Sequence, residues 1–300
     1  MTRILVTGAT AGIGYFIAEQ LAGQGATVVL GARSLARAES ARAAILAAHP
    51  SASVEVLPLD LGSLASLSAA DYGDQLDALV LNGATMRVRR GDVTADGLDP
   101  IMETGHLGNA ALIEAAMPAL ERSPRGRIVG TTSGLVRRMK PTLPDLATIS
   151  LPLVSASMFS VGRRYVQSKA AHEAYLYELD RRLRASGSSV VALLSHPWVA
   201  VDSRSPVVPG IARGRRRDEP LFGLLGIGKD VAARVAVHAA TGAEADGGQY
   251  WEPVHGVPTL GSGDPSYRSP ELGARVWRET QELLASTRQK ALPSGSWSTT

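Results

Sequence analysis

The chain has 300 residues, of which 45% are hydrophobic and 20% are charged, and its formal net charge is +3. A chain of this length and apolar content can bury a large core, which excludes an intrinsically disordered protein. It contains no cysteine, which excludes disulfides, thiolate metal sites and thiol nucleophiles. Its six histidines are widely spaced and form no helical pair, so we expect no metal site.

Membrane and nucleic-acid functions are also disfavoured. Apolar runs such as 190–194 are far too short to span a bilayer, and no signal peptide is expected at Met1-Thr2-Arg3. The densest basic run, Arg213–Arg217, has no interleaved aromatic residues, so it indicates a solvated loop or a contact with an anion rather than a nucleic-acid surface. We therefore expect a cytoplasmic protein with a small-molecule substrate.

Short apolar runs alternate with helical patterns along most of the chain. Strands are predicted at 4–7, 27–32, 54–59, 78–81, 127–132 and 189–194, with an edge strand at 249–251. Helices are predicted at 13–24, 35–48, 64–72, 99–122, 163–186 and 230–241. This alternation is typical of the α/β class, with a Rossmann-type, doubly wound parallel sheet.

No repeat or linker divides the chain, so we expect one domain over residues 1–290. Two long connections that contain several prolines, about 135–162 and 198–228, are predicted to form lids over the substrate. Their apolar side chains favour a bulky, largely apolar substrate. Residues 291–300 are predicted to form a loose C-terminal tail.

A glycine-rich stretch, Thr7-Gly8-Ala9-Thr10-Ala11-Gly12-Ile13-Gly14, joins the first predicted strand to the first predicted helix. Its first glycine permits a tight turn, the second lets the backbone approach a pyrophosphate, and the third allows close packing of helix and strand. The N–H groups at the helix start attract phosphate. The predicted phosphate-binding residues are Gly8, Thr10, Ala11, Gly12, Ile13 and Gly14.

The second predicted strand is followed by Arg33, and no acidic residue occurs before Glu39. A carboxylate at this position would repel a ribose 2′-phosphate, whereas a guanidinium can pair with it. Arg33 therefore favours NADP(H) as the cofactor. The alternative is a surface arginine beside bound NAD.

Two further motifs carry acid–base chemistry. Tyr165 and Lys169 are four residues apart on a predicted helix, so they share one face, and an ammonium beside a phenol lowers the pKa of that phenol. Ser133 ends the fifth predicted strand, at the sheet edge where ligands bind, and can donate a hydrogen bond to a substrate oxygen. Taken alone, it could equally be a turn or helix-cap serine.

Together these motifs resemble the short-chain dehydrogenase/reductase family, in particular its retinol dehydrogenase and protochlorophyllide reductase branch, over about residues 3–285. The resemblance implies the catalytic residues Ser133, Tyr165 and Lys169, the last two also touching the cofactor. It implies further cofactor contacts at Asp60, Leu61, Asn82, Gly83, Ala84, Pro197 and Val199. It also implies homodimers or homotetramers formed across long helices.

Two positions depart from the family pattern. Trp198 follows Pro197 where the family usually has glycine. Gly105 stands where the branch carries an asparagine that anchors a proton-relay water, and Asn109 lies one turn further on. A relay to solvent is needed only for a redox cycle. We therefore keep a non-redox enzyme on this scaffold (a cyclase, dehydratase or isomerase of a specialised metabolite) as an alternative.

The favoured function is an NADP(H)-dependent oxidoreductase that transfers a hydride between nicotinamide and a carbonyl/alcohol pair. In that reaction Tyr165 protonates the carbonyl oxygen, Lys169 lowers the pKa of the phenol and binds the nicotinamide ribose, and Ser133 orients the substrate oxygen. A third alternative is a non-catalytic NADP-binding sensor, which would not require the intact set of three side chains.

Overall fold

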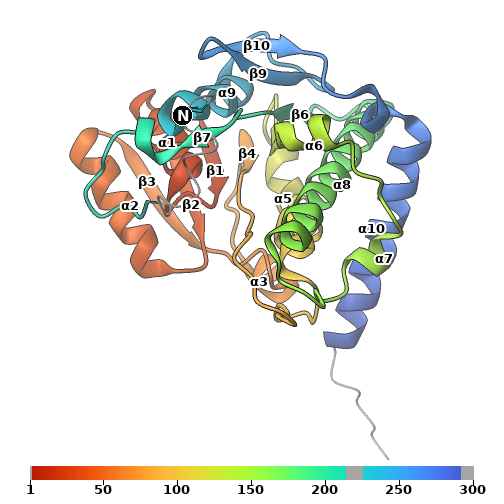
Figure 1. Cartoon of the computed structure of the whole chain (residues 1–300). Coiled ribbons are helices and arrows are strands. Elements are labelled where there is room, and N and C mark those ends of the chain that lie inside the picture. Colours follow the sequence, from red (N-terminus) through yellow and green to blue (C-terminus); the bar gives the residue numbers. More distant parts are fainter. Residues whose placement is uncertain (1, 214–225, 292–300) are drawn as a thin grey trace, which may run out of the picture.

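Alternating apolar strands and helices build a central sheet that is covered on both faces (Figure 1). The computed structural model describes residues 2–213 and 226–291. Within them the sheet has eight strands in the order β10-β9-β6-β5-β4-β1-β2-β3, and β10 alone runs antiparallel to its neighbour. The strands are β1 (Arg3–Thr7), β2 (Thr27–Ala32), β3 (Ser53–Pro58), β4 (Ala78–Leu81), β5 (Arg127–Thr131), β6 (Val191–Ser195), β9 (Tyr250–Val254) and β10 (Val257–Gly261).

The remaining elements are helical, apart from a short strand pair after β6. That pair is β7 (Ala200–Val201) and β8 (Ile227–Gly228). The helices are α1 (Gly12–Gly23), α2 (Leu35–Ala48), α3 (Leu64–Ala69), α4 (Pro100–Met102), α5 (Gly108–Glu121), α6 (Gly134–Met139), α7 (Leu146–Ile149), α8 (Met158–Ala185), α9 (Lys229–Thr241) and α10 (Pro270–Ala291). The π-helix η1 (Glu103–Leu107) joins α4 to α5, and η2 (Asp202–Arg204) and η4 (Pro265–Arg268) are 3₁₀ turns. The predicted α/β doubly wound fold is confirmed.

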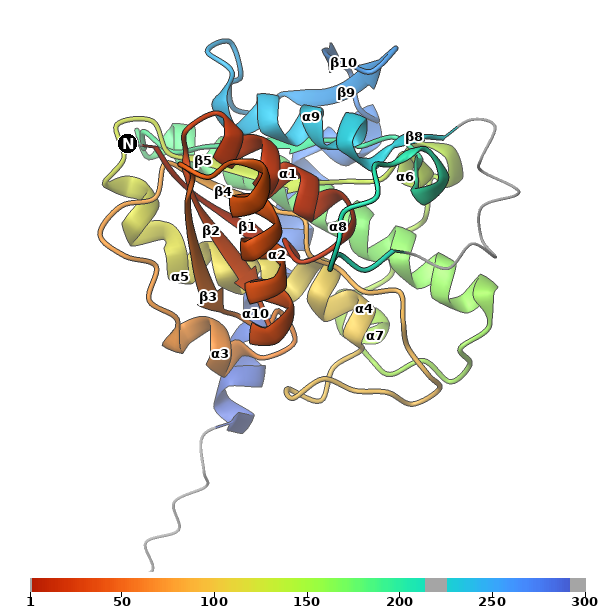
Figure 2. The same cartoon turned by 90° about the vertical axis from the view of Figure 1, so that its left-hand side faces the viewer.

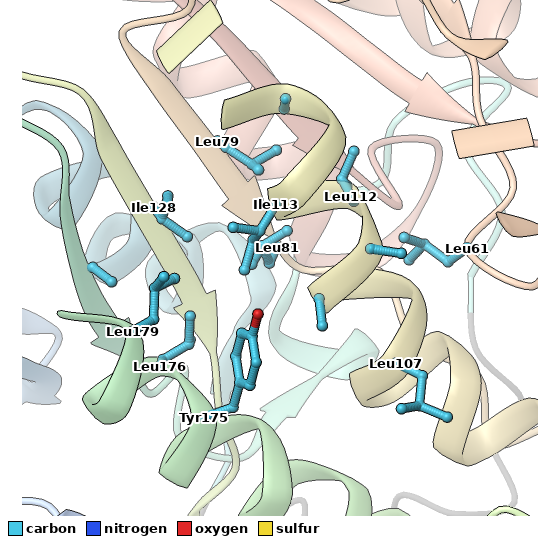
Figure 3. Packing of buried hydrophobic residues seen from close by; sticks show 14 of the residues in the cluster. Leu61, Leu79, Leu81, Leu107, Leu112, Ile113, Ile128, Tyr175, Leu176 and Leu179 are labelled. Atoms are coloured by element: carbon cyan, nitrogen blue, oxygen red, sulfur yellow. The ribbon is translucent and has the colours of Figure 1, made fainter. Parts of the chain in front are cut away.

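Strand side chains alternate between two apolar layers. On β1, Leu5 joins the layer beneath α3, α5 and α8, whereas Ile4 and Val6 join the layer beneath α1, α2 and α9. Figure 3 shows the first layer, in which Tyr175 of α8 projects among leucine and isoleucine side chains of β4, β5 and α5. Because both faces are buried, the strands are nearly continuous in apolar residues.

The C-terminal helix α10 lies outside α8, so this side of the sheet has two layers of helix (Figure 1). Trp277 of α10 stacks on Tyr175 of α8, with ring centroids 4.9 Å apart and ring planes 8° from parallel. Gln281 donates a 2.9 Å hydrogen bond to Glu114 of α5. Within the same chain, α10 thus covers the outer side of α8 and reaches α5 through side-chain hydrogen bonds.

Several boundaries differ from those predicted. The helix expected at 99–122 contains the π segment η1, and α8 begins at Met158 rather than at 163, because the Ser157 side chain caps it by accepting from the Ser160 N–H at 3.1 Å. The 135–162 connection is partly helical, since it holds α6 and α7. Residues 214–225 of the second predicted lid and 292–300 of the predicted tail lie outside the described residues. No helix among the described residues is both long and apolar enough to cross a membrane.

Candidate active site

The predicted site residues follow the carboxyl ends of the parallel strands. In Figure 2, where β1 starts beside the N-terminus at the left, α6, α7, β8 and the start of α8 all lie at the opposite, right-hand side. Ligands of open α/β sheets bind at this carboxyl edge. They bind where the loops that follow two neighbouring strands run to opposite faces of the sheet and leave a crevice between them. The candidate site is therefore built from the segments that follow β1 to β6.

The glycine-rich turn between β1 and α1 takes the backbone form that its sequence predicts. Gly8 and Gly12 have φ of +65° and +61°, a region that side chains with a Cβ rarely occupy. A Cβ on Gly8 would lie 2.9 Å from the Gly83 Cα, so the turn is pressed against the segment after β4. That segment is fixed by Thr7, whose Oγ1 accepts from the N–H groups of Asn82 at 3.0 Å and Gly83 at 2.9 Å.

The start of α1 fits a bound phosphate. Ala11 is the N-cap of α1 and offers no side-chain acceptor to the first N–H groups of the helix. A Cβ built on Gly12 would meet no atom within 4 Å, so the turn is open on that side. Donors that no side chain caps, next to the backbone bridge between Ala11 and Ala212, and the positive end of the helix dipole favour an anion such as a dinucleotide pyrophosphate.

The segments after β2 and β3 continue this edge. Arg33 follows β2 directly, and its side chain is exposed. Asp60 follows β3 and accepts from the Gly62 N–H at 3.0 Å. Leu61 packs toward the segment after β4, since a Cβ on Gly83 would lie 2.7 Å from the Leu61 Cδ1. Asp60, Leu61 and Gly83, which the family resemblance implies as cofactor contacts, therefore lie close together, and Arg33 lies at the neighbouring strand end.

Ser133 and Tyr165, which are 32 residues apart in the sequence, meet in the structure. Ser133 is the N-cap of α6 and accepts from the Leu135 N–H at 3.4 Å, so the capping role considered for it is real. Its side chain also forms a hydrogen bond with Tyr165 of α8. Capping fixes the serine at the end of β5, and that position brings it to the phenol.

The pKa of Tyr165 differs from the expected direction. Burial raises the pKa of the phenol, and the hydrogen bond with Ser133 opposes this rise only in part. Removing a phenolate from water costs more than one hydrogen bond returns. In the structure as described, the predicted lowering of this pKa by Lys169 is therefore wrong. Tyr165 is a protonated acid at neutral pH.

Lys169 is buried, with 2% of its surface exposed, and Nζ donates to the Thr131 carbonyl at 2.8 Å. Burial lowers the pKa of its ammonium to about 8. One turn further along α8, Glu173 accepts a 2.8 Å hydrogen bond from the Thr132 hydroxyl, and burial raises its pKa to about 7. Thr131, Thr132 and Glu173 were not predicted as part of the site, although Glu173 lies at the same four-residue spacing after Lys169 that singled out Tyr165.

The segment after β6 places His196 and Pro197 beside the start of α6. The His196 ring is buried and lies against Gly134, because a Cβ on that glycine would be 2.6 Å from the ring Nε2. Val199 accepts from the Ile227 N–H at 2.9 Å, which ties this segment to β8. Pro197 and Val199 thus lie at the carboxyl end of the strand next to the one that carries Ser133.

Gly105 lies in η1, where it packs directly against α8. A Cβ there would be 2.5 Å from the Ser168 Oγ and 3.0 Å from the Ser168 Cβ. Asn109 is buried, and its Nδ2 donates to the Thr104 carbonyl at 2.9 Å. The glycine is therefore explained by the close approach of η1 to α8, and Asn109 is engaged with the backbone of η1.

We expect Gly105→Ala to destabilise the protein by about 1–3 kcal/mol, because the added methyl group overpacks the contact with Ser168. Gly162→Ala is the matched control, since that helical glycine has no atom within 4 Å of a built Cβ. The control change is expected to be neutral or to stabilise by up to about 1 kcal/mol. Urea unfolding of both variants checks this. Equal effects at the two glycines would contradict the packing explanation.

A buried carboxyl lies in the same π segment. Glu103 has 0% of its surface exposed, and its pKa is raised to about 9, chiefly by burial and further by the neighbouring Asp96. The charge of Asp60 acts in the same direction. Glu103 is therefore protonated at neutral pH and lies near Asp60, which follows the carboxyl end of β3. No sequence pattern predicted Glu103 as a buried residue near the site.

Exposed apolar side chains gather on the segments that follow the carboxyl ends of the strands. They are Met86, Met139, Leu151, Val154, Met158, Phe159, Trp198 and Val207. Met139 and Phe159 also line a hollow of about 340 Å³ between the end of α6 and the start of α8. Val166 lines this hollow, but Ser133 and Tyr165 do not. The hollow therefore lies beside the Ser133–Tyr165 pair and does not contain it.

A Rossmann-type sheet with a glycine-rich turn after its first strand and a Ser-Tyr-Lys set is typical of dinucleotide-dependent enzymes, and comparison with known proteins agrees. The sequence model of the short chain dehydrogenase family matches residues 2–144. Retinol dehydrogenase 13 of Homo sapiens is 28% identical over 97% of this chain and 88% of its own length. Polyprenol dehydrogenase of Mus musculus is 31% identical over 93% of this chain and 82% of its own length.

A solved structure has the same fold over nearly the whole chain. An uncharacterized protein from Mycobacterium paratuberculosis superposes with a TM-score of 0.71 at 25% identity, covering 95% of this chain and 94% of that one. The chain belongs to the short-chain dehydrogenase/reductase family, in its retinol dehydrogenase-like branch. The family resemblance predicted from the motifs is thereby confirmed.

Proposed function

We propose that the protein is an NADP(H)-dependent oxidoreductase that interconverts a carbonyl and an alcohol on a bulky, largely apolar substrate. The observation that carries this proposal is the Ser133–Tyr165 hydrogen bond at the end of β5, one helical turn from the buried Lys169. Exposed apolar side chains around the carboxyl edge support an apolar substrate. Retinol and polyprenol, named for two relatives, are substrates of this kind.

The chain's own residues have distinct tasks in this proposal. The open turn at Gly12 and the uncapped start of α1 hold the pyrophosphate, and Arg33 pairs with the 2′-phosphate. Ser133 orients the substrate oxygen, and Tyr165, whose phenol is protonated at neutral pH, gives that oxygen a proton. Lys169, buried one turn further along α8 and with a pKa lowered to about 8, binds the nicotinamide ribose. A bound nicotinamide supplies the hydride.

The direct test is NADPH absorbance during turnover of an aldehyde and ketone panel that includes retinal and long-chain aldehydes. Stoichiometric oxidation of NADPH is the expected result. Product formed without any change in absorbance would overturn the proposal in favour of the non-redox enzyme. Binding of NADPH with no product from any compound would favour the sensor.

The cofactor preference is a separate prediction. We expect tighter binding of NADPH than of NADH, and we expect Arg33→Ala to weaken NADPH binding about 10- to 150-fold while leaving NADH binding nearly unchanged. One charge-assisted hydrogen bond to phosphate contributes about 1.5–3 kcal/mol. Fluorescence titration of both cofactors measures this. The matched control is Arg278→Ala, an exposed arginine of α10 that pairs with Glu282. Equal NADPH and NADH affinities in the unaltered protein would refute the preference.

A further inference from the structure

Trp198 holds a backbone conformation that tryptophan rarely adopts. Its φ is +60°, in the left-handed region, where a bulky side chain is strained. Among the described residues, two others that are not glycine share a positive φ, and each has a local reason. Lys140 ends α6 as a left-handed C-cap, and His255 with Gly256 forms the tight turn between β9 and β10.

No helix cap or hairpin turn accounts for Trp198, which lies between β6 and β7. Backbone strain of this kind persists only where the surrounding structure holds it, and it concentrates at functional sites. The side chain is also unusual, because 42% of this large aromatic residue is exposed. The strained backbone and the exposed indole together indicate a functional role for Trp198.

The indole is linked to the candidate site through His196. Its ring lies 5.8 Å from the His196 ring, centroid to centroid, at an angle of 55°. The His196 ring in turn lies against Gly134, the residue that follows Ser133. A short chain of contacts thus runs from the indole to the serine that pairs with Tyr165.

We propose that Trp198 is a specificity-determining residue, whose indole forms an aromatic wall for a planar, conjugated or aromatic part of the substrate. This inference rests on the proposed function, because the carbonyl is placed at Ser133 and Tyr165. The other exposed apolar side chains near the site are mostly flexible or aliphatic, such as Met86, Met139 and Val207. A rigid indole selects flat groups, because stacking needs two planar partners.

The test compares two aldehydes of matched size, 2-naphthaldehyde and its saturated counterpart decahydro-2-naphthaldehyde. In the unaltered protein the KM for the planar aldehyde is expected to be about 3- to 10-fold lower, from the usual strength of aromatic stacking. Trp198→Phe is expected to keep this ratio, and Trp198→Gly is expected to abolish it with little change in kcat. Raised KM for both aldehydes by the same factor in Trp198→Gly would overturn the proposal.

Stability separates this role from a structural one. Trp198→Gly relieves the left-handed strain, so its Tm is expected to stay at or above that of the unaltered protein. His255→Gly is the matched control, because it relieves the same kind of strain in the hairpin turn and is expected to leave both KM values unchanged. A clear fall in Tm for Trp198→Gly, with equal KM changes for both aldehydes, would identify a residue that only supports the fold.

Calorimetric titration of both aldehydes into the protein with NADP⁺ added separates this inference from the proposed function. Preferential binding of the planar aldehyde that is lost in Trp198→Gly supports the aromatic wall even if no turnover is seen, in which case the oxidoreductase proposal alone fails. Turnover of both aldehydes without any preference leaves the oxidoreductase standing and overturns the wall. Binding of neither aldehyde also counts against the wall.

Discussion

Tyr165→Phe is expected to lower kcat/KM for a cognate carbonyl about 10²- to 10⁴-fold, the usual contribution of a positioned general acid. The change removes one hydroxyl, which forms the hydrogen bond with Ser133 and has a pKa raised by burial. The fold and most of the NADPH affinity are expected to survive, because the ring is kept. Steady-state rates, circular dichroism and an NADPH titration measure the three quantities.

Tyr72→Phe provides the control for loss of a buried phenol. The Tyr72 hydroxyl donates to the Leu67 carbonyl at 2.6 Å on the α3 side of the molecule, far in the fold from Ser133. This variant is expected to lose some stability and no activity. Rates in Tyr165→Phe that match those of the Tyr72→Phe control would show that the phenol does not take part in the reaction.

Glu103→Gln is expected to stabilise the protein strongly at pH 8 and hardly at all near pH 4.5. The folded-state pKa of Glu103, about 9, lies above its ordinary value of 4.5. Between these two values the folded protein keeps a proton that the unfolded chain has lost. The contribution of Glu103 to the free energy of unfolding thus has its full value below pH 4.5. It falls as pH rises toward 9, by up to about 1.4 kcal/mol per pH unit.

A glutamine carries no titratable proton, so the variant escapes this loss, and its advantage grows to a few kcal/mol by pH 8. Urea unfolding at pH 5 and pH 8 measures the difference. Glu39→Gln, an exposed residue of α2 that pairs with Arg42, is expected to show the same small change at both pH values. A Glu103→Gln variant that is equally affected at pH 5 and pH 8 would mean that Glu103 is ionised in the folded protein.

The parts of the fold that the sequence predicts are those governed by local pattern. The boundaries of β2 and α2 agree with their predicted residues, because an apolar strand and a helix each carry a clear period. β10 was missed, because Pro258 and exposed side chains obscure an edge strand. The π segment was missed, and its packing of Gly105 against Ser168 joins residues that are distant in the sequence.

In the candidate site too, features that lie within one element could be predicted from the sequence, whereas features that depend on contacts between elements could not. The turn at Gly8 and Gly12, and the spacing of Tyr165 and Lys169, could be predicted because each lies within one element and follows from backbone geometry. The hydrogen bond between Ser133 and Tyr165 depends on how β5, α6 and α8 meet. The direction of the Tyr165 pKa depends on burial, which the four-residue spacing does not report. The strained backbone of Trp198 has no sequence pattern that predicts it.

The helix α10 has a consequence for assembly. Where subunits of a protein associate through the outer faces of long helices, each subunit contributes a layer of helix to the other. Here the chain supplies that layer to itself, through Trp277 on Tyr175 and Gln281 on Glu114. Association across α5 and α8 would require α10 to leave them and expose the stacked aromatic pair to water. An oligomer that keeps α10 in place would have to use a surface other than the side of α8 that α10 covers, and the hairpin of β9 and β10 carries exposed apolar side chains at Val254, Val257 and Leu260.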